Sequence, residues 1–599
     1  MFVPSNITSS SFVHLAWDNN DLIEETLTGL GTTHCTNGIA IQRQVHIAQP
    51  KELPGTVCVQ PATRRRRARS IAPPPQLDVE YVGAKRPGPP LLPIPGAILH
   101  SYHQNQQVKD SILSEDFAWL LSRLSTGDSA SFGQQEMEQT TPGWSAFNAS
   151  VAQSDVIRPS IIGYLPVIPA SLTELSTVYT LLKRSVNLAN ELKQQDVVIV
   201  LDQAIYALAQ DIMSKHCEEF KHVVLRLGGF HFAMTMMAVI GKRFADSGLQ
   251  SILVESGLAG EGAVQGVLNG KHYNRALRCH KIVMEAFFRL CWQAFEQYLD
   301  DHPGMKLATS AQNQLADVLN MLQAQPTKQS LWELLSLPAY ADLQRIFASF
   351  VDGLKSPLSQ LWLSYVQMVH LLLQFLRASR TGNWYLHMLC VRRMLSWMVA
   401  YDCPNYTRYG SLYWCQMLQL EGSHPEVYEQ FLEGEFCVQR CSTSAFSQVP
   451  VDQAIEQTVN RHTKAKGGIV RFSQKPGAVQ QWIVNAHQRA DVTRNVLAMA
   501  GMEDSVEDVH VHKEAKPTRR AKDEQAVLAV VNVVLGWKNP FLCAEDEPMS
   551  NISSRLVAPP NVSNDLLSAF TQGEEHLRQL IKDRLITGTV KFQDPLPAL

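Results

Sequence analysis

Three acidic residues of the sequence stand where the metal site of an α/β protein would need them. Asp18 follows the apolar run "FVHLAW", Asp202 follows the apolar run Val197–Leu201, and Glu456 lies in the helix-like segment "VDQAIEQTVN". Mg²⁺ prefers hard oxygen ligands, and a pair of such ions about 3.5–4 Å apart clamps the attacking and leaving oxygens of a phosphoryl transfer. The pattern predicts a catalytic, metal-binding triad of Asp18, Asp202 and Glu456 that holds Mg²⁺, with Mn²⁺ as a substitute.

The alternative for each acid is an ordinary helix cap or turn residue. Within the triad we expect Asp202 to be the strictest requirement, because the continuous apolar run before it is typical of a central strand covered on both faces. A buried carboxylate is costly unless it is paired or metal-bound. Asp18 is followed by Asn19, Asn20 and Asp21, whose oxygens are spare ligands, so we expect its loss to be milder.

The order of the acids along the chain predicts the fold class. An acid after the first strand, a second acid after a central strand, one more strand ("HVVLRL"), a long helical stretch and a helix with the last acid describe a transposase core. We therefore expect an α/β fold: a ribonuclease-H-like mixed sheet core interrupted by a large all-helical insertion. The segment "NGIAIQRQVHI" alternates in polarity and is predicted to be a half-buried strand of this sheet.

Composition shifts divide the 599 residues into six regions. A Pro- and Arg-rich stretch cannot build a core and is predicted to be a linker, while the helical pattern between the last strand and Glu456 is predicted to be an insertion and not an independent domain. The predicted regions are 1–47, the first strands of the core; 48–105, the linker; 106–230, the core with its central strands; 231–435, the helical insertion; 436–500, the return of the core with the acidic helix; and 501–599, a charged C-terminal region.

Long segments of the chain resemble a known family. They include "FVHLAWDNNDLIEETLTGLGTTHCTNGIAIQ", "VVLRLGGFHFAMTMMAVIGKRFADSGL" and "VDQAIEQTVNRHTKAKGGIVRFSQKPGAVQQWIV". From about residue 12 to 595 the sequence resembles a large, poorly characterised family of multicopy animal proteins that are transposon-derived. The resemblance implies an origin from a transposase of the DDE type, which cleaves and joins DNA strands.

Two histidines bear on the predicted site. His231 in "GGFH" follows a strand and is a candidate to orient a water or a phosphate, the alternative being a packed, hydrogen-bonded histidine. His462 departs from the resemblance, since relatives commonly carry "NRDTKTKGG" where this chain has "NRHTKAKGG". A histidine facing Glu456 would weaken the capture of a metal ion.

Two basic clusters are candidates for nucleic-acid binding. The first lies in the linker, where it is a nuclear localisation signal or a phosphate-contacting arm, the alternative being a solvated tether. The second surrounds Tyr273, whose ring would stack on a base while the cations meet phosphates, the alternative being the solvated face of a helix. The candidate residues are Arg64, Arg65, Arg66 and Arg67 in the first cluster and Arg275, Arg278 and Lys281 in the second.

Other features exclude several classes of protein. The net charge of −3 does not suit a chain that wraps nucleic acid over its whole surface. There is no signal peptide pattern, and the apolar stretch 361–376 is interrupted by polar residues, so it is predicted to be a buried helix and not a membrane span. No G-x-S-x-G nucleophile motif is present. We expect DNA as the partner, self-association, no membrane, and a nuclear, otherwise cytoplasmic, location without secretion.

Two functions from different classes follow. The first is a transposase-derived enzyme that uses Mg²⁺ to cleave and transfer DNA strands. The second is a catalytically inactive, domesticated module of the same fold that binds nucleic acid or protein. The two are separated by geometry, because an active triad must converge on one site.

Overall fold

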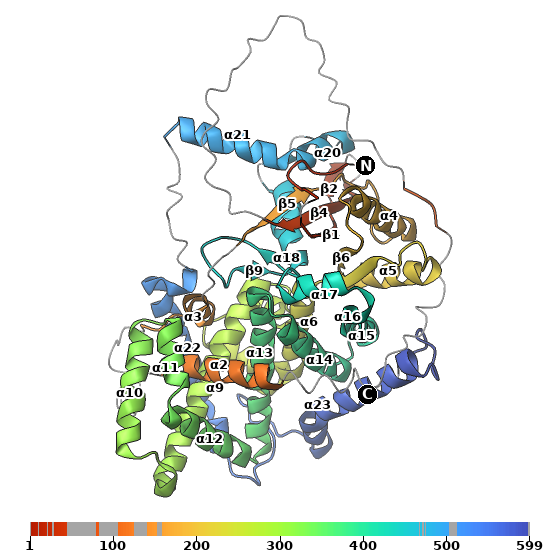
Figure 1. Cartoon of the computed structure of the whole chain (residues 1–599). Helices are drawn as coiled ribbons and strands as arrows, with labels where there is room; N and C mark the ends of the chain where they lie inside the picture. The colour runs from red at the N-terminus through yellow and green to blue at the C-terminus, as the bar shows by residue number, and fades with distance from the viewer. Residues whose placement is uncertain are drawn as a thin grey trace, which may run out of the picture.

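The computed structural model describes the chain at residues 2–9, 11–20, 22–26, 29–44, 79–82, 106–124, 140–152, 158–465, 468–469, 473, 475–501 and 512–596. Figure 1 shows a sheet at one end of the molecule and a large body of helices at the other. Arg64–Arg67, and with them the predicted nuclear signal, lie outside the described residues.

A mixed sheet carries the two predicted strand-end acids. Its strands in the described residues are β1 (Val13–Asn19), β4 (Thr36–Arg43), β5 (Ser160–Tyr164), β6 (Val197–Leu201) and β7 (Val223–Leu227), in the order β5-β4-β1-β6-β7. β1, β4 and β5 pair antiparallel, whereas β1, β6 and β7 pair parallel. A small hairpin of β2 (Leu22–Thr26) and β3 (Gly29–Thr33) joins β1 to β4. The prediction of an α/β fold with a mixed sheet is confirmed.

Both faces of the sheet are covered. One face packs on α4 (Leu175–Glu191) and α5 (Gln203–Lys215) and belongs to a hydrophobic core that runs on into the helical body. The other face packs on the helical segment made of α18 (Val451–Ile455), η5 (Glu456–Asn460) and α19 (Arg461–Lys464), together with α20 (Pro476–Val484). β4 is therefore buried from Thr36 to Gln42. The predicted half-buried strand is wrong, because both of its sides are covered. α20 and the acidic helix pack on Ile39 and Ile41, and the side with Ala40, which the alternation assigned to solvent, belongs to the larger core.

The helical body fills the sequence between the last strand and the acidic helix. α6 follows β7 directly, and the longest helices, α9 and α13, lie side by side at its centre. Its elements are α6 (Gly229–Phe244), η2 (Ala245–Leu249), α7 (Gln250–Glu255), α8 (Glu261–Leu268), α9 (Tyr273–Asp301), η3 (Pro303–Met305), α10 (Thr309–Ala324), α11 (Lys328–Leu335), α12 (Pro338–Gly353), α13 (Pro357–Thr381), α14 (Trp384–Ala400), η4 (Tyr406–Gly410), α15 (Ser411–Leu418), α16 (Leu420–Ser423) and α17 (Pro425–Leu432). Because these helices share one continuous apolar core with the sheet, this body is not packed as a separate unit.

Segments from both ends of the chain complete the body. α2 (Gln106–Ser122) and α3 (Trp144–Val151) join it from the N-terminal side, and β8 (Val438–Gln439) and β9 (Gln448–Val449) lead back to the acidic helix. The described part of the C-terminal region holds two long helices. α21 (Ala486–Met499) precedes this region, whose elements are η7 (Lys513–Ala515), α22 (Pro517–Trp537), η8 (Pro540–Leu542), α23 (Pro560–Leu580) and η9 (Ile581–Ile586). α22 packs on α9 and α23 packs on α14.

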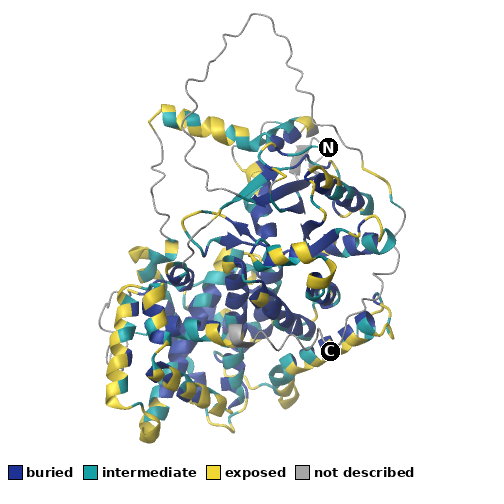
Figure 2. Cartoon of the chain, viewed as in Figure 1, coloured by how far each residue is buried: buried dark blue, intermediate teal, exposed yellow. Residues whose placement is uncertain are grey.

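Burial follows this layout. Strands β1, β4, β6 and β7 and most of α13 and α14 are dark blue in Figure 2, whereas α10 and α21 are mostly exposed. The apolar stretch 361–376 lies in α13 and is largely buried, as predicted. In the part of the chain that the structure describes, no helix has the length and apolarity needed to span a membrane.

Candidate functional site

The structure brings Asp18, Asp202 and Glu456 together at one edge of the sheet. β1 and β6 are parallel neighbours that pair Ala16 with Val200, and two further residues along each strand place Asp18 beside Asp202. Because side chains alternate between the two faces of a strand, both acids lie on the face that carries Ala16 and Val200. That face packs on the acidic helix, and the carboxyl group of Glu456 is hydrogen-bonded to that of Asp18.

Asp18 is the buried member of the triad, with 9% of its surface exposed. Its carboxyl group accepts hydrogen bonds from the Asn19 backbone N–H at 2.8 Å and from Asn460 Nδ2 at 2.9 Å. Burial raises the pKa of Asp18 well above its ordinary value, and the charge and hydrogen bond of Glu456 raise it further. Folding therefore favours the protonated form of Asp18.

The expectation that Asp202 is the buried carboxylate is wrong. Its side chain is 34% exposed, because the residue is the N-cap of α5 and lies beyond the end of the buried strand. Asp202 Oδ1 accepts the backbone N–H of Gln203 at 2.9 Å, so the capping alternative also applies to it. Of the two aspartates, Asp18 is the one fixed by packing, so the ground for ranking Asp202 first does not hold.

Asp452 is a functional candidate that the sequence analysis missed. It lies one helical turn before Glu456 and is 5% exposed. Its carboxylate caps the N-terminus of α6, accepting the backbone N–H groups of Phe230 and His231, each at 3.1 Å. The signal in the sequence was the spacing of Asp452 and Glu456 by four residues, which places two acids on one face of a helix.

His231 links Asp452 to the triad. Its Nδ1 lies 3.2 Å from Asp452 Oδ2 and 3.5 Å from Asp202 Oδ1. Burial alone would lower the pKa of His231, but the hydrogen bond and charge of Asp452, with the charges of Asp202 and Asp18, raise it to about 9. The imidazole is therefore a cation among carboxylates at neutral pH. It is hydrogen-bonded to Asp452, and a role in orienting a water or a phosphate stays a prediction.

Gly228 makes the approach of Asp452 to α6 feasible. A Cβ atom at this position would lie 2.3 Å from Asp452 Oδ2. The backbone of Gly228 is extended, with φ −63° and ψ 120°. An alanine can therefore adopt this conformation without strain, and its methyl group would clash with the Asp452 carboxylate.

We expect Gly228→Ala to lower the free energy of unfolding by about 1–3 kcal/mol, because the added methyl group displaces a buried carboxylate from its cap. Urea unfolding followed by circular dichroism measures the change. Gly262→Ala is the matched control, since its Cβ meets nothing within 4 Å in α8, and it should leave stability unchanged or slightly higher. Equal stability of the two variants would contradict this account of the cap.

A chain of amides ties the strand end to the acidic helix. Asn37, which faces Asp18 across β4 and β1, donates through Nδ2 to Asn460 Oδ1 at 3.0 Å. Asn20 Nδ2 donates to Thr463 Oγ1, also at 3.0 Å. The "DNN" and "NRHT" segments are more than 400 residues apart in the sequence, and these hydrogen bonds fix their positions relative to each other next to the carboxylates.

The spare oxygens expected beside Asp18 are committed only in part. Asn19 Oδ1 accepts the backbone N–H of Leu172 at 3.1 Å. Asn20 donates to Thr463 through Nδ2, whereas its Oδ1 is buried and has no hydrogen-bond partner among the described residues. Asp21 lies outside the described residues. His462 is exposed, and burial together with the charges of Arg461 and Arg489 lowers its pKa. Nothing in the described residues places His462 against Glu456.

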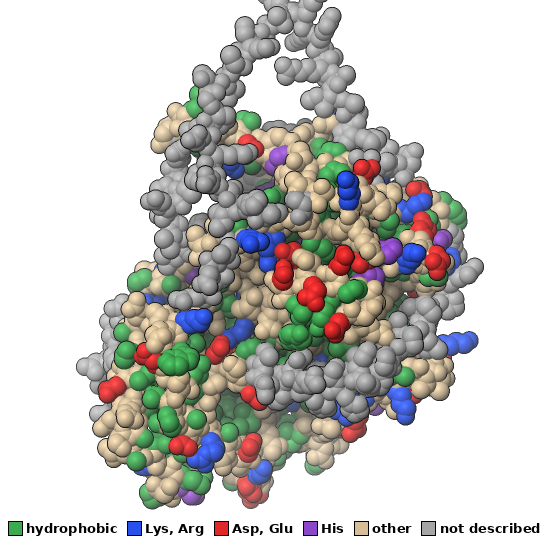
Figure 3. All heavy atoms as spheres, in the orientation of Figure 1, with side chains coloured by type: hydrophobic (Ala, Val, Ile, Leu, Met, Phe, Trp, Pro, Cys, Tyr) green, Lys and Arg blue, Asp and Glu red, His purple; other side chains and the backbone are tan. Residues whose placement is uncertain are grey.

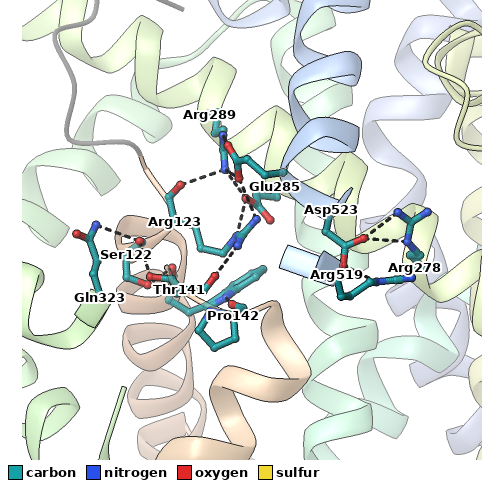
Figure 4. A network of polar contacts seen from close by, with 12 residues as sticks. Ser122, Arg123, Thr141, Pro142, Arg278, Glu285, Arg289, Gln323, Arg519 and Asp523 are labelled. Atoms are coloured by element: carbon teal, nitrogen blue, oxygen red, sulfur yellow. Dashed lines mark hydrogen bonds and ion pairs between the residues drawn. The ribbon is translucent and has the colours of Figure 1, made fainter. Parts of the chain in front are cut away.

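The second basic cluster is engaged with the C-terminal region. Arg278 Nη2 lies 2.8 Å from Asp523 Oδ1 in α22, as Figure 4 shows, and Lys281 is ion-paired with Glu514. Tyr273 packs its ring against Phe230, with centroids 4.8 Å apart. Arg275 is exposed. Nucleic-acid binding by Arg275, Arg278 and Lys281 stays a prediction. Arg278 and Lys281 already pair with carboxylates of the C-terminal region, whereas the side chain of Arg275 is exposed to solvent.

The Lys281–Glu514 pair gives a prediction about pH. Burial alone would raise the pKa of Glu514, but the charge and hydrogen bond of Lys281 lower it to about 2. A carboxyl group whose pKa is depressed by folding stabilises the fold above its unfolded pKa, near 4.5, and loses that contribution as the pH falls toward 2. We expect Glu514→Gln to cost about 2–3 kcal/mol at neutral pH, with the difference from wild type shrinking below about pH 4.5.

Urea unfolding at neutral pH and at several acidic pH values measures this difference. The exposed Glu255 provides the control variant Glu255→Gln, which should match wild type throughout. A cost that stays constant as the pH falls would show that Glu514 acts by shape and not by charge.

Comparison with known proteins gives one match. Residues 143–595 match the model of a family described as a domain of unknown function (DUF8702). No curated protein and no solved structure matches the chain.

Proposed function

The chain belongs to the DUF8702 family, a domain of unknown function, and we propose from its site that it is a transposase-derived protein with a ribonuclease-H-like core. In this proposal Asp18, Asp202 and Glu456 carry Mg²⁺-dependent cleavage and transfer of DNA strands. The observation that supports it best is that the buried Asp18 contacts Glu456, although the two residues are more than 400 positions apart in the sequence. Asp202 lies beside them, at the end of the neighbouring strand.

The order of elements also supports the proposal. Acids follow β1 and β6, β7 comes next, the helical body intervenes, and the helix with Glu456 then packs on β1 and β6. This is the order expected of a ribonuclease-H-like transposase core with a helical insertion. The sheet edge is also where α/β folds gather their ligands.

The donor set fits Mg²⁺ by its chemistry. All three groups are hard carboxylate oxygens. Burial, together with the charge and hydrogen bond of Glu456, raises the pKa of Asp18, and a cation bound beside both carboxyl groups would oppose that shift. The described residues contain no group of three or more His, Cys, Asp or Glu side chains already arranged around a metal position, so the donor set is not preformed. When bound, the ions would stabilise the charge that develops on the attacking and leaving oxygens.

The chain's own groups have separable roles in this proposal. Asp18 exchanges its proton for the cation beside Glu456. The amides of Asn460 and Asn37 hold the Asp18 carboxylate in place, and Asp202 completes the donor set on the exposed side. His231, held by Asp452, supplies a donor next to Asp202. A phosphate at the sheet edge would meet that donor.

One observation favours the alternative of a catalytically inactive, domesticated module that binds nucleic acid or protein. His231 already contacts Asp202, so the exposed carboxylate has a protein partner in place of an ion. On the face drawn in Figure 3, acidic and basic side chains are intermingled, which suits a protein partner at least as well as a nucleic-acid backbone.

Nicking of supercoiled plasmid DNA tests the proposal. The purified protein is incubated with Mg²⁺ or Mn²⁺ at millimolar concentration, and with EDTA. We expect open-circular DNA to accumulate with either ion and not with EDTA. Equal nicking in EDTA, or no nicking with both ions, would reject the enzyme and leave the binding module.

A further inference from the structure

Arg243 is a buried cation without a carboxylate partner in the described residues. It lies at the C-terminal end of α6 with only 4% of its surface exposed. Its Nη1 donates to the hydroxyl of Tyr401 at 2.6 Å, its Nη2 donates to Ser364 Oγ at 3.0 Å, and its Nε has no partner among the described residues. A buried guanidinium that meets only neutral groups is costly, so a counter-charge from outside the chain would stabilise it.

Aromatic rings surround this guanidinium. Its carbon lies 5.1 Å from the ring centroid of Trp397, 5.3 Å from that of Phe244 and 5.9 Å from that of Tyr401. Ring faces attract a cation, which explains how the charge is tolerated in the protein alone. They do not supply the negative charge or the hydrogen-bond acceptor that Nε lacks.

Arg243 lines a cavity of about 320 Å³ between α6, α13, α14 and α23. Arg393 lines the same cavity and likewise has no carboxylate partner among the described residues, and no Asp or Glu contributes to the lining. Trp397 and Phe570 form an aromatic wall, with ring centroids 5.1 Å apart. The cavity thus combines two guanidinium groups that lack a carboxylate partner in the described residues with an aromatic wall of two rings tilted by 46°.

We propose that this cavity binds a small organic anion: a planar or aromatic body against Trp397 and Phe570, with a carboxylate or phosphate held by Arg243 and Arg393. Guanidinium groups match the fork of such anions with paired hydrogen bonds. The volume suits a molecule of modest size. Gln367, which also lines the cavity, offers a further donor at its mouth.

This site is separate from the proposed catalytic centre. His231 and Arg243 lie at opposite ends of α6, twelve residues apart, which corresponds to roughly 18 Å along the helix. The proposal does not require DNA cleavage, and it holds for an active enzyme and for an inactive module alike.

Calorimetric titration with phenyl phosphate and with benzoate tests the proposal, with benzyl alcohol as the neutral probe. We expect saturable binding of at least one anion and none of the alcohol. Arg393→Gln, at a half-buried position, should weaken anion binding on the order of tenfold, and Thr571→Trp at the exposed rim should block it. The exposed Arg345, which pairs with Asp342 on the surface of α12, provides the matched control variant Arg345→Gln, and this variant should bind the anion as wild type does.

Arg243→Met separates a ligand-binding role from a structural one. If Arg243 binds an anion, the variant loses anion binding, while its melting temperature stays the same or rises because an uncompensated charge is removed. A lower melting temperature together with no anion binding by wild type would overturn the proposal and leave Arg243 as a packing residue. Binding of a single-stranded oligonucleotide with no binding of phenyl phosphate or benzoate would also overturn it, since the anion would then belong to a nucleic-acid strand.

Discussion

Replacing Asp18 with asparagine should abolish metal-dependent DNA cleavage, lowering its rate at least about a hundredfold, on the scale of the loss of a principal electrostatic group. The side chain keeps its size but can no longer hold a cation, and it breaks the carboxyl pair with Glu456. The plasmid assay measures the loss. Asp202→Asn should also impair cleavage but less severely, because its side chain is 34% exposed and water can take its place.

The same variant should change stability in a direction set by the pKa of Asp18. Burial and Glu456 raise that pKa above 3.8, so folding favours the protonated form. Burial of the Asp18 carboxyl group does not reduce stability through ionisation below pH 3.8, and the destabilisation grows as the pH rises above that value. In EDTA, Asp18→Asn should therefore melt no lower than wild type at neutral pH, and the advantage should shrink toward about pH 4.

Thermal melts in EDTA and in Mg²⁺ check this prediction. Mg²⁺ should raise the melting temperature of wild type and not that of Asp18→Asn. The control is Asp317→Asn, an exposed position in α10, which should respond to Mg²⁺ as wild type does. A variant that melts far below wild type at neutral pH would mean that the Asp18 carboxylate is structural.

Glu285→Gln should produce the largest loss of stability, about 3–5 kcal/mol, the usual cost of breaking a buried ion pair on one side. Figure 4 shows the network in which it lies. Glu285 Oε1 lies 2.7 Å from both Arg123 Nε and Arg289 Nη2, and Glu524 in α22 contacts the same two arginines. With Glu285 neutral, two buried guanidinium groups would share one remaining carboxylate.

Urea unfolding measures this cost. The matched control is Asp342→Asn, which breaks the exposed pair with Arg345, whose side chain is 74% exposed, and it should cost less than about 1 kcal/mol. Since the network joins the end of α2 to α9 and α22, the variant should also expose the C-terminal region to proteolysis. A cost as small as that of the control would contradict the role given to the network.

The strand-end acids could be predicted because their signals are local. A continuous apolar run that stops at an acid identifies β6 and Asp202 without any knowledge of the fold, and the same holds for β1 and Asp18. Their burial could not be predicted, since it depends on what packs beyond the strand end. Asp202 caps α5 at the surface, whereas Asp18 is covered by Glu456 and Asn460.

The contact between Asp452 and His231 could not be predicted from the sequence for the same reason. Asp452 and His231 are 221 residues apart, and neither position implies the other in the sequence. The burial of β4 also depends on distant segments that cover both of its sides, so its alternating pattern was misleading. Likewise, the basic cluster around Arg278 gave no sign that α22 would supply Asp523 as its partner.

Binding of Mn²⁺, followed by the loss of its free-ion signal in electron paramagnetic resonance, tests the central claim most directly, because it reports the ion and not a downstream activity. We predict saturable binding by wild type that weakens at least about tenfold in Asp18→Asn and in Glu456→Gln, since each removes a hard oxygen donor from one site. Asp317→Asn should bind as wild type does. Equal Mn²⁺ affinity in all four proteins would contradict the claim that these carboxylates form one metal site.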